Sequence, residues 1–358
     1  MLKKLLWPLL ALLTLLLRAL AHAHPAWTER YYSRGFFQGV RWTVDTLLGW
    51  LPFPAVYLLF GGLLWLIGKG VHFLFFRRSL PLRRRLLGAG STLITFLCGT
   101  LVLFYWMWGY NYSRVSIEEQ LALPPVKPTV ADLKNALEAQ TVVVLGLRTQ
   151  VQPDTSRPIV ATLSPDTMER QVRAALVQRL RSLGFPVPGS PRGRQPFWEG
   201  FLLRFGASGI YNPFTGECNI DQGLHFLTKP YNLAHEFCHG YGFADEGTCN
   251  FLAYLALEQS DQPLLRYSAE LDYWRTLAST YRRLQPEVYA TFRKDLPSGF
   301  RADLEQIYQK LEQYPEFFEA FRYEVYDQYL KAQGIAEGMQ NYSKVIPLIM
   351  AYRLKEKG

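Results

Sequence analysis

The chain has 358 residues and a formal net charge of +9, but the positive charge is unevenly distributed. Residues 1–109 contain 12 basic and 2 acidic residues, whereas residues 110–358 contain 27 basic and 28 acidic residues. The near-neutral larger part excludes a broadly basic nucleic-acid-binding surface, so we expect no nucleic-acid partner. The basic excess lies beside apolar segments instead, where it is typical of loops that orient a protein in a lipid bilayer.

Three apolar segments occupy the first third of the chain. Residues 1–23 begin with a pair of lysines and are interpreted as either a signal peptide or a first transmembrane helix. Residues 51–76 and 86–109 are each long enough to cross a bilayer. The sequence therefore predicts two or three N-terminal transmembrane helices, with the lipid bilayer as their partner.

The basic residues 77–85 set the expected orientation of these helices. They include five arginines and no acid, and positive loops of this kind stay in the cytoplasm. Residues 24–50 are then an extracytoplasmic loop. Everything after residue 110 is also expected on the outer side of a membrane that the chain crosses more than once.

The remaining chain is interpreted as a linker over residues 110–128 and one domain over residues 129–358. Three prolines between residues 124 and 128 mark the linker. The domain is predicted to contain strands at 141–147, 201–205 and 218–221. Its predicted helices span residues 130–139, 165–183, 233–241, 246–259, 263–283, 285–294, 300–313, 315–333 and 341–355. The predicted fold class is therefore mainly α with a small β-sheet.

The cysteines limit the kinds of site that the domain can hold. None of the four belongs to a Cys-x-x-Cys pair, which argues against a cysteine-only zinc site. Cys218, Cys238 and Cys249 could supply one disulfide in an oxidising compartment. Three small buried thiols fit the sequence at least as well.

Residues 235–239 read His-Glu-Phe-Cys-His, which is an HExxH motif. Residues four apart share one face of a helix, so His235 and His239 can bind one cation together. Neutral imidazole suits Zn²⁺, and Glu236 is placed to take a proton from a zinc-bound water. Glycines follow the motif and a second apolar helical pattern begins at once, so the chain turns sharply beside the two histidines. This context predicts a zinc site with Glu236 as the general base.

A catalytic zinc needs a third protein ligand, and two acids follow the motif. Asp245 completes an HExxHxxGxxD pattern, which resembles metzincin-type peptidases with Asp in place of the third His. Glu246 instead begins Glu-x-x-x-Asn, which resembles the gluzincin arrangement, and Asn250 could orient a zinc-bound histidine. We favour Glu246 as the ligand, because Asp245 has a separate explanation as a helix N-cap.

Several stretches of the chain carry a family resemblance. They are HPxWxERYYSRG at 24–35, LPF at 51–53, TGE at 215–217, HExxHxxGFAxExxxNF at 235–251 and GMQNYSKV at 338–345. On these stretches the chain resembles the bacterial membrane proteins classed as domain of unknown function 3810. The resemblance implies a zincin-like outer domain of unassigned substrate in a bacterial inner membrane. Relatives often carry a further acid where this chain has Thr248, which leaves Glu246 as the acid in the matching place.

These features together predict a membrane-anchored zinc metallopeptidase that cleaves peptides or proteins outside the cytoplasm. An extended substrate could pair with the strand at 218–221. Two other hypotheses stay open, namely a non-catalytic envelope scaffold stabilised by zinc and a zinc amidase acting on cell-envelope material. The intact Glu236 disfavours the scaffold, since a structural site needs no general base. A narrow closed pocket would favour the amidase, and an open cleft with an exposed edge strand would favour the peptidase.

Hydrolysis also needs a donor that stabilises the oxyanion. No histidine follows His239, which leaves tyrosines and arginines as candidates. Tyr342 lies in the family-like stretch at 338–345, so we select it as the candidate donor. Ordinary packing is the more common explanation for one tyrosine among 21, and Tyr342 is singled out only by its place in this stretch and by the absence of a later histidine.

Overall fold

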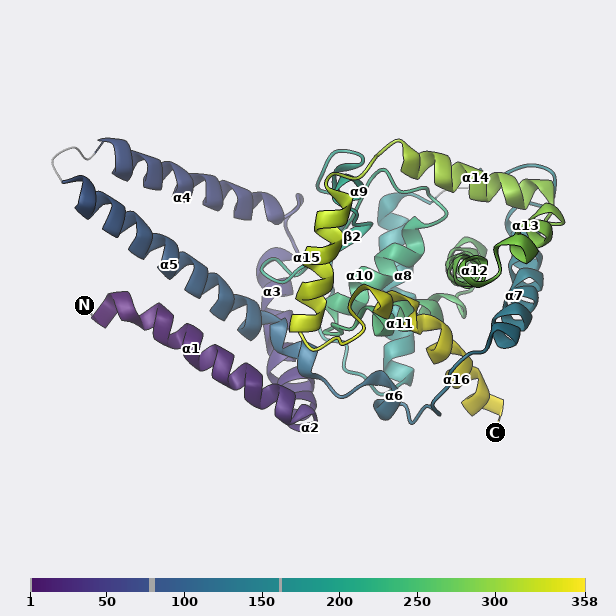
Figure 1. Cartoon of the computed structure of the whole chain (residues 1–358), viewed down its shortest axis with the longest axis horizontal. Coiled ribbons are helices and arrows are strands. Elements are labelled where there is room, and N and C mark those ends of the chain that lie inside the picture. Colours follow the sequence, from purple (N-terminus) through teal and green to yellow (C-terminus); the bar gives the residue numbers. More distant parts are fainter. Residues whose placement is uncertain (1, 77–80, 161–162, 358) are drawn as a thin grey trace.

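Helices make up most of the computed structural model, which describes residues 2–76, 81–160 and 163–357 (Figure 1). One three-stranded sheet lies within this described part of the chain. Three long helices extend to one side of a larger helical body (Figure 1). The predicted class, mainly α with a small sheet and apolar N-terminal helices, is confirmed.

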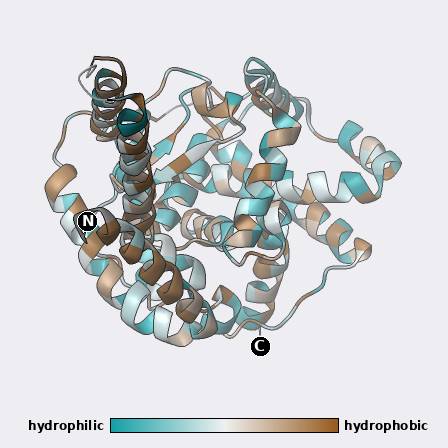
Figure 2. Ribbon diagram, turned by 60° about the vertical axis from the view of Figure 1, so that its left-hand side comes forward, coloured by the Kyte–Doolittle hydropathy of each residue, from teal (hydrophilic) through white to brown (hydrophobic). Residues whose placement is uncertain are grey.

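The three long helices are α1 (Leu2–Ala23), α4 (Val56–Phe76) and α5 (Leu82–Met107). Each is long and apolar enough to cross a membrane, and hydrophobic residues dominate their ribbons (Figure 2). α5 contacts both α1 and α4. These helices mark the chain as a membrane protein. α4 begins five residues later than the predicted segment 51–76, because two prolines in that stretch disfavour a helix.

The structure describes only part of the predicted basic loop 77–85. Residues 77–80, with two of its five arginines, lie outside the described residues. The other three arginines lie in the first turn of α5. Positive charge therefore stands at one end of that span, as the sequence predicts.

Residues 24–50 are almost entirely helical rather than an irregular loop. α2 (Pro25–Trp27), the π-helix η1 (Thr28–Phe36) and α3 (Phe37–Leu48) follow one another directly. Buried residues recur every four positions along this segment, at Glu29, Ser33, Phe37 and Arg41. This spacing places them on one helical face, which packs against the helical body.

The predicted strand at 141–147 is wrong. Those residues lie inside α7 (Val130–Val151), which starts with a capping box between Thr129 and Asp132. Its buried side chains recur at helical spacing and pack against α12 (Pro263–Leu284). The run of β-branched residues at 141–144 favours a strand locally, but this long-range packing outweighs the local preference.

The remaining helices form the body around the sheet. Their bounds are η2 (Gly109–Ser113), α6 (Ile117–Gln120), α8 (Pro165–Ser182), α10 (Lys229–Gly240), α11 (Glu246–Leu257), α13 (Pro286–Lys294), α14 (Ser298–Glu312), α15 (Glu319–Ala332), η3 (Gly338–Lys344) and α16 (Val345–Lys357). Most follow the predicted ranges closely. The predicted helix at 341–355 divides into the 3₁₀-helix η3 and the α-helix α16.

The sheet has the strand order β1-β3-β2. β1 (Gly193–Arg194) pairs in parallel with β3 (Glu217–Ile220), and β2 (Gly209–Asn212) pairs with β3 in antiparallel fashion. The predicted strand at 201–205 is wrong, because the short helix α9 (Phe201–Arg204) lies there. The carboxylate of Asp221 accepts hydrogen bonds from the backbone N–H groups of Gly200 and Leu202, at 2.7 and 2.6 Å. This acid, 19 residues beyond Leu202, stabilises the start of α9.

The core of the body surrounds α10 and α11. α10 contacts α8, α11, α12, β2 and β3, and α11 contacts α8, α12, α16 and η3. Almost every residue of both helices is buried. Polar side chains on their facing surfaces must therefore satisfy one another or a bound ion.

Candidate metal centre

α10 and α11 are joined by a sharp turn beside the HExxH motif. α10 ends at Gly240, and Gly242 has a φ of +89°, a conformation that glycine adopts at little cost. A Cβ at position 242 would also lie 2.6 Å from the ring of Phe37. Asp245 Oδ1 then accepts a hydrogen bond of 2.7 Å from Thr248 N and caps α11. The turn thus brings the start of α11 against the end of α10.

Three buried side chains converge where these helices meet. His235 Nε2 lies 3.1 Å from His239 Nε2 and 3.0 Å from Glu246 Oε2, and His239 Nε2 lies 3.3 Å from the same oxygen. Donor atoms held at about 2.1 Å by a tetrahedral ion are about 3.4 Å apart. The three atoms have nearly this spacing, so the group could hold a metal ion.

Both histidines are oriented through their other ring nitrogen. Nδ1 of His235 lies 2.7 Å from Asn250 Oδ1, and the Asn250 amide nitrogen donates to the carbonyl of Tyr342 at 3.1 Å. Nδ1 of His239 donates to the carbonyl of Phe243 at 2.8 Å. A neutral imidazole that donates from Nδ1 keeps a lone pair on Nε2. Two such lone pairs and a carboxylate oxygen face one point, which is the donor set that a divalent cation requires.

The ionisation of the group follows from its burial. Burial raises the pKa of Glu246, but the two histidines outweigh this effect and hold that pKa well below its usual range. Burial lowers the pKa of His239, while the adjacent Glu246 raises it to about 9. A proton therefore resides in the metal-free group at neutral pH, and a binding metal ion must displace it.

Glu236 lies on the same helix, beside this group. Its side chain is buried, and its Oε2 has no hydrogen-bond partner among the described residues. Burial raises the pKa of Glu236, although both histidines act in the opposite direction. β2 passes so close that a Cβ at Gly209 would lie 2.7 Å from Glu236 Oε1. An acid with a raised pKa and an unpaired oxygen next to a candidate metal-binding group has the properties of a proton acceptor.

Two tyrosines lie on the other side of the group. The ring of Tyr342, from η3, stacks parallel to the ring of His235, with centroids 6.3 Å apart. The hydroxyl of Tyr326, from α15, donates to Glu246 Oε1 at 2.9 Å. The two hydroxyl oxygens are 3.5 Å apart. Tyr342 therefore borders the group, while Tyr326 directly holds the second oxygen of Glu246.

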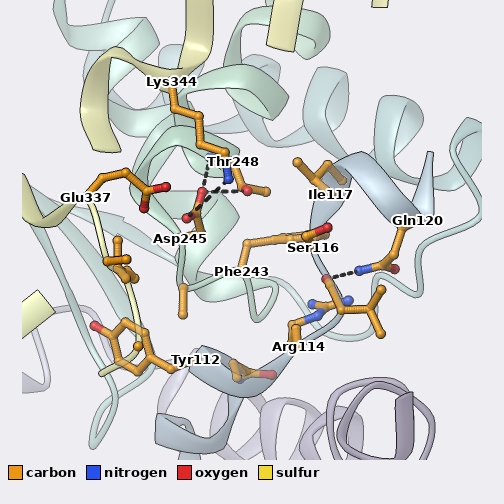
Figure 3. A pocket seen from close by; sticks show the side chains of 16 residues that line it. Tyr112, Arg114, Ser116, Ile117, Gln120, Phe243, Asp245, Thr248, Glu337 and Lys344 are labelled. Carbon is orange, nitrogen blue, oxygen red and sulfur yellow. Dashed lines mark hydrogen bonds and ion pairs between the residues drawn. The ribbon is translucent and has the colours of Figure 1, made fainter. Parts of the chain in front are cut away.

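Asp245 is turned away from the histidines. Its Oδ2 accepts from the Asn341 amide at 2.9 Å, and Lys344 Nζ lies 3.9 Å away. Asp245 and Lys344 line a cavity of about 290 Å³, whose lining also includes Phe243 and Arg114 (Figure 3). The cavity lining excludes His235, His239 and Glu246, so it lies beside the metal-binding group rather than at it. Asp245 thus serves as the N-cap, and Glu246 is the acid next to the histidines.

The sheet places a different strand at the site than the sequence indicates. The sequence indicates that the strand at 218–221 could pair with a substrate, but β3 is the central strand and is paired on both sides. The edge strand next to Glu236 is β2. The backbone of Ser208 bonds to Asp221, and bonding alternates along an antiparallel strand, so the backbone groups of Gly209 face away from β3.

The cysteines form no disulfide. All four are free, and Cys218, Cys238 and Cys249 are buried. Cys218 Sγ donates to the carbonyl of Glu236 at 3.2 Å, and Cys249 Sγ lies 3.4 Å from His239 Nδ1. These thiols pack behind the motif and do not belong to the metal-binding group.

Comparison with known protein families shows which family the chain belongs to. The model of a family described as "Protein of unknown function (DUF3810)" matches residues 32–350. The chain belongs to this family. The DUF3810 match covers the candidate spans α4 and α5, the candidate metal-binding group and both tyrosines. No curated protein and no solved structure matches the chain.

Two residues of the site, Tyr326 and Gly209, belong to no motif that the sequence analysis identifies. Tyr326 lies 80 residues after Glu246, in a helix with several tyrosines. Gly209 lies in a stretch that reads as a turn between two predicted strands. Helical spacing of Tyr326, Tyr329 and Leu330 marks the inner face of α15, but only the structure shows what that face contacts.

Proposed function

We propose that this protein is a zinc metallopeptidase, anchored in the bacterial inner membrane, whose catalytic domain lies outside the cytoplasm. The observation that carries the proposal is the convergence of His235, His239 and Glu246 beside Glu236. Each histidine is oriented by an oxygen acceptor on Nδ1, which leaves Nε2 for a metal. Three protein ligands leave one position open, as catalytic zinc sites do.

Zinc bound to this group would polarise a substrate carbonyl and lower the pKa of a coordinated water. Glu236 would accept the proton of that water and pass it to the leaving amine, a role that its raised pKa favours. Tyr342 would donate a hydrogen bond to the oxyanion, with Tyr326 3.5 Å away to orient its hydroxyl. The burial of Glu236 and of the three candidate ligands excludes bulk water and strengthens these interactions.

The strand β2 supports a peptide as the substrate. It is an edge strand, it lies against Glu236, and the side chain of Ile210 on it is exposed. An extended peptide could add to this edge by backbone hydrogen bonds and pass its scissile bond by Glu236. An amidase for small envelope molecules has no need of such an edge. A scaffold with a structural zinc has no need of the unpartnered Glu236 Oε2.

The test uses the purified full-length chain in lipid nanodiscs with zinc and quenched fluorogenic peptides. We expect hydrolysis that stops with a chelator and returns with zinc. Glu236→Gln should lower the rate by about 10²–10⁴-fold, the usual contribution of a general base. The control variant is Glu287→Gln in the first turn of α13, outside the candidate site, which should retain full activity.

Three outcomes would contradict the peptidase proposal. Full activity of Glu236→Gln would remove the assigned base. Hydrolysis of small envelope amides without any hydrolysis of peptides would favour the amidase. Zinc bound at one equivalent with no hydrolysis of either substrate class would favour the scaffold. A reporter fused to the C-terminus tests the outer location independently, and it should be active only outside the cytoplasm.

A further inference from the structure

The segment from Phe36 to Trp50, which includes α3, has an unusual exposed face. Every exposed residue between 36 and 50 is uncharged. Apart from Gly39, these residues are Phe36, Trp42, Thr43, Thr46, Leu47 and Trp50. They recur three or four positions apart and so form one stripe, which runs from the end of η1 along α3 to the turn that follows α3. Trp42 and Trp50 are 60% and 72% exposed, which is unusual for a surface that faces water.

The opposite face of α3 carries the charges and is buried. Arg41 is 2% exposed, and its Nη1 donates to the Gly216 carbonyl at 2.9 Å and to the Tyr211 hydroxyl at 3.3 Å. Asp45 pairs with Arg41 and accepts a bond of 2.7 Å from Ser190 N. The helix therefore directs its ionic groups inward and its aromatic groups outward. A helix at a water-facing surface has the reverse pattern.

Both ends of this segment lead to candidate membrane spans. α1 ends at Ala23 on one side, and α4 begins at Val56 on the other. The ring of Phe36 packs edge-on against Trp106 of α5, with centroids 5.7 Å apart. In Figure 1, α3 lies where the long helices meet the body. The exposed stripe is therefore continuous with the surface of the spans.

We propose that α3 is an interfacial helix whose exposed stripe lies in the surface of the lipid bilayer. Trp and other aromatic side chains concentrate at this depth, with apolar rings among acyl chains and polar edges near headgroups. The inner face of α3 contacts the sheet through Arg41 and the turn after the HExxH motif through Phe37. The helix thus holds the metal-binding group close to the membrane surface. This placement is independent of the reaction that the group performs.

Spin labels on matched threonines test the placement in the full-length chain. Thr46 is exposed on α3 and donates to the carbonyl four residues before it. Thr291 is exposed on α13 and makes the same kind of bond. Each is changed to Cys in a Cys98→Ser background, because Cys98 is the only cysteine that is not buried. The labelled chains are reconstituted in phospholipid bilayers and exposed to oxygen, which partitions into lipid, or to a water-soluble nickel chelate.

The label at position 46 should collide more with oxygen than with the chelate, and the label at 291 should show the reverse. If both labels collide more with the chelate than with oxygen, the proposal is overturned. Spin–spin broadening at position 46, with little access to either reagent, would show that a second copy of the chain covers the stripe and would overturn it as well. Thr43→Cys provides a second label on the stripe if Thr46→Cys fails to fold, and the same criteria apply.

Discussion

Asn250 Oδ1 lies 2.7 Å from His235 Nδ1, on the side of the imidazole opposite the metal-binding group. Because the Asn250 amide nitrogen is committed to the Tyr342 carbonyl, its oxygen must face the histidine. One side chain of α11 therefore fixes the tautomer of a histidine on α10 and links it to η3. Oriented partners of this kind determine how well a histidine binds metal.

Asn250→Ala should weaken zinc binding by about 10–100-fold, because His235 loses the acceptor that fixes its ring. Chelator competition on the full-length chain measures this affinity. Asn341→Ala is the matched control, since Asn341 is buried and bonds Gly247 N at 2.7 Å but contacts neither histidine. Equal losses in both variants would show that Asn250 acts only through general packing.

Zinc affinity should rise with pH. Glu246 raises the pKa of His239 to about 9 in the metal-free group, so the imidazole is protonated below that pH. Zinc binds only the neutral ring and must release this proton. The apparent affinity should therefore increase by about tenfold per pH unit up to about pH 9 and then level off. An affinity that stays constant from about pH 6.5 to 8.5 would show that no such proton is displaced.

The residues of the site that lie on α10 and at the start of α11 can be predicted from local sequence rules. His235 and His239 are four residues apart on one helix, so their common face follows from helical geometry alone. The choice of Glu246 over Asp245 rests on N-cap chemistry, and Asp245 does bond Thr248 N. Asn250 follows one turn later by the same reasoning. These predictions required no knowledge of the rest of the chain.

Long-range packing determines the parts that the sequence does not predict. Tyr326 reaches Glu246 only because α15 folds back over η3, and no local pattern encodes that contact. The run at 141–144 has strand propensity but is held in α7 by α12. Segment 201–205 becomes helical because Asp221, distant in sequence, bonds its first backbone amides. Each error arises where a tertiary contact outweighs a local preference.

Gly209→Ala should lower hydrolysis without removing zinc. The new Cβ would lie 2.7 Å from Glu236 Oε1 and 2.8 Å from the Asn219 carbonyl oxygen, so the base must move. The control is Gly146→Ala in α7, where a Cβ meets nothing within 4 Å. That change should leave activity intact and stabilise the helix by roughly 0.5–1 kcal/mol. Unchanged hydrolysis in Gly209→Ala would mean that the position of Glu236 is not critical.

Tyr342→Phe and Tyr326→Phe should affect different steps. Loss of an oxyanion donor lowers kcat by about 10²–10³-fold, and we expect this of Tyr342→Phe with zinc affinity retained. Tyr326→Phe removes the hydroxyl that bonds Glu246 Oε1 at 2.9 Å, so its main effect should be weaker zinc binding. Measuring kcat at saturating zinc and zinc affinity separates the two. The opposite division of effects would exchange the assigned roles.

The central claim, that His235, His239 and Glu246 form one zinc site, is tested most directly by metal stoichiometry. Zinc per chain is measured by mass spectrometry for the purified full-length protein and for two neighbouring isosteric variants. Wild type and Asp245→Asn should each bind about one zinc, because asparagine also caps a helix, while Glu246→Gln should lose most of it. Zinc retained at full occupancy by Glu246→Gln, or lost from Asp245→Asn alone, would contradict the account.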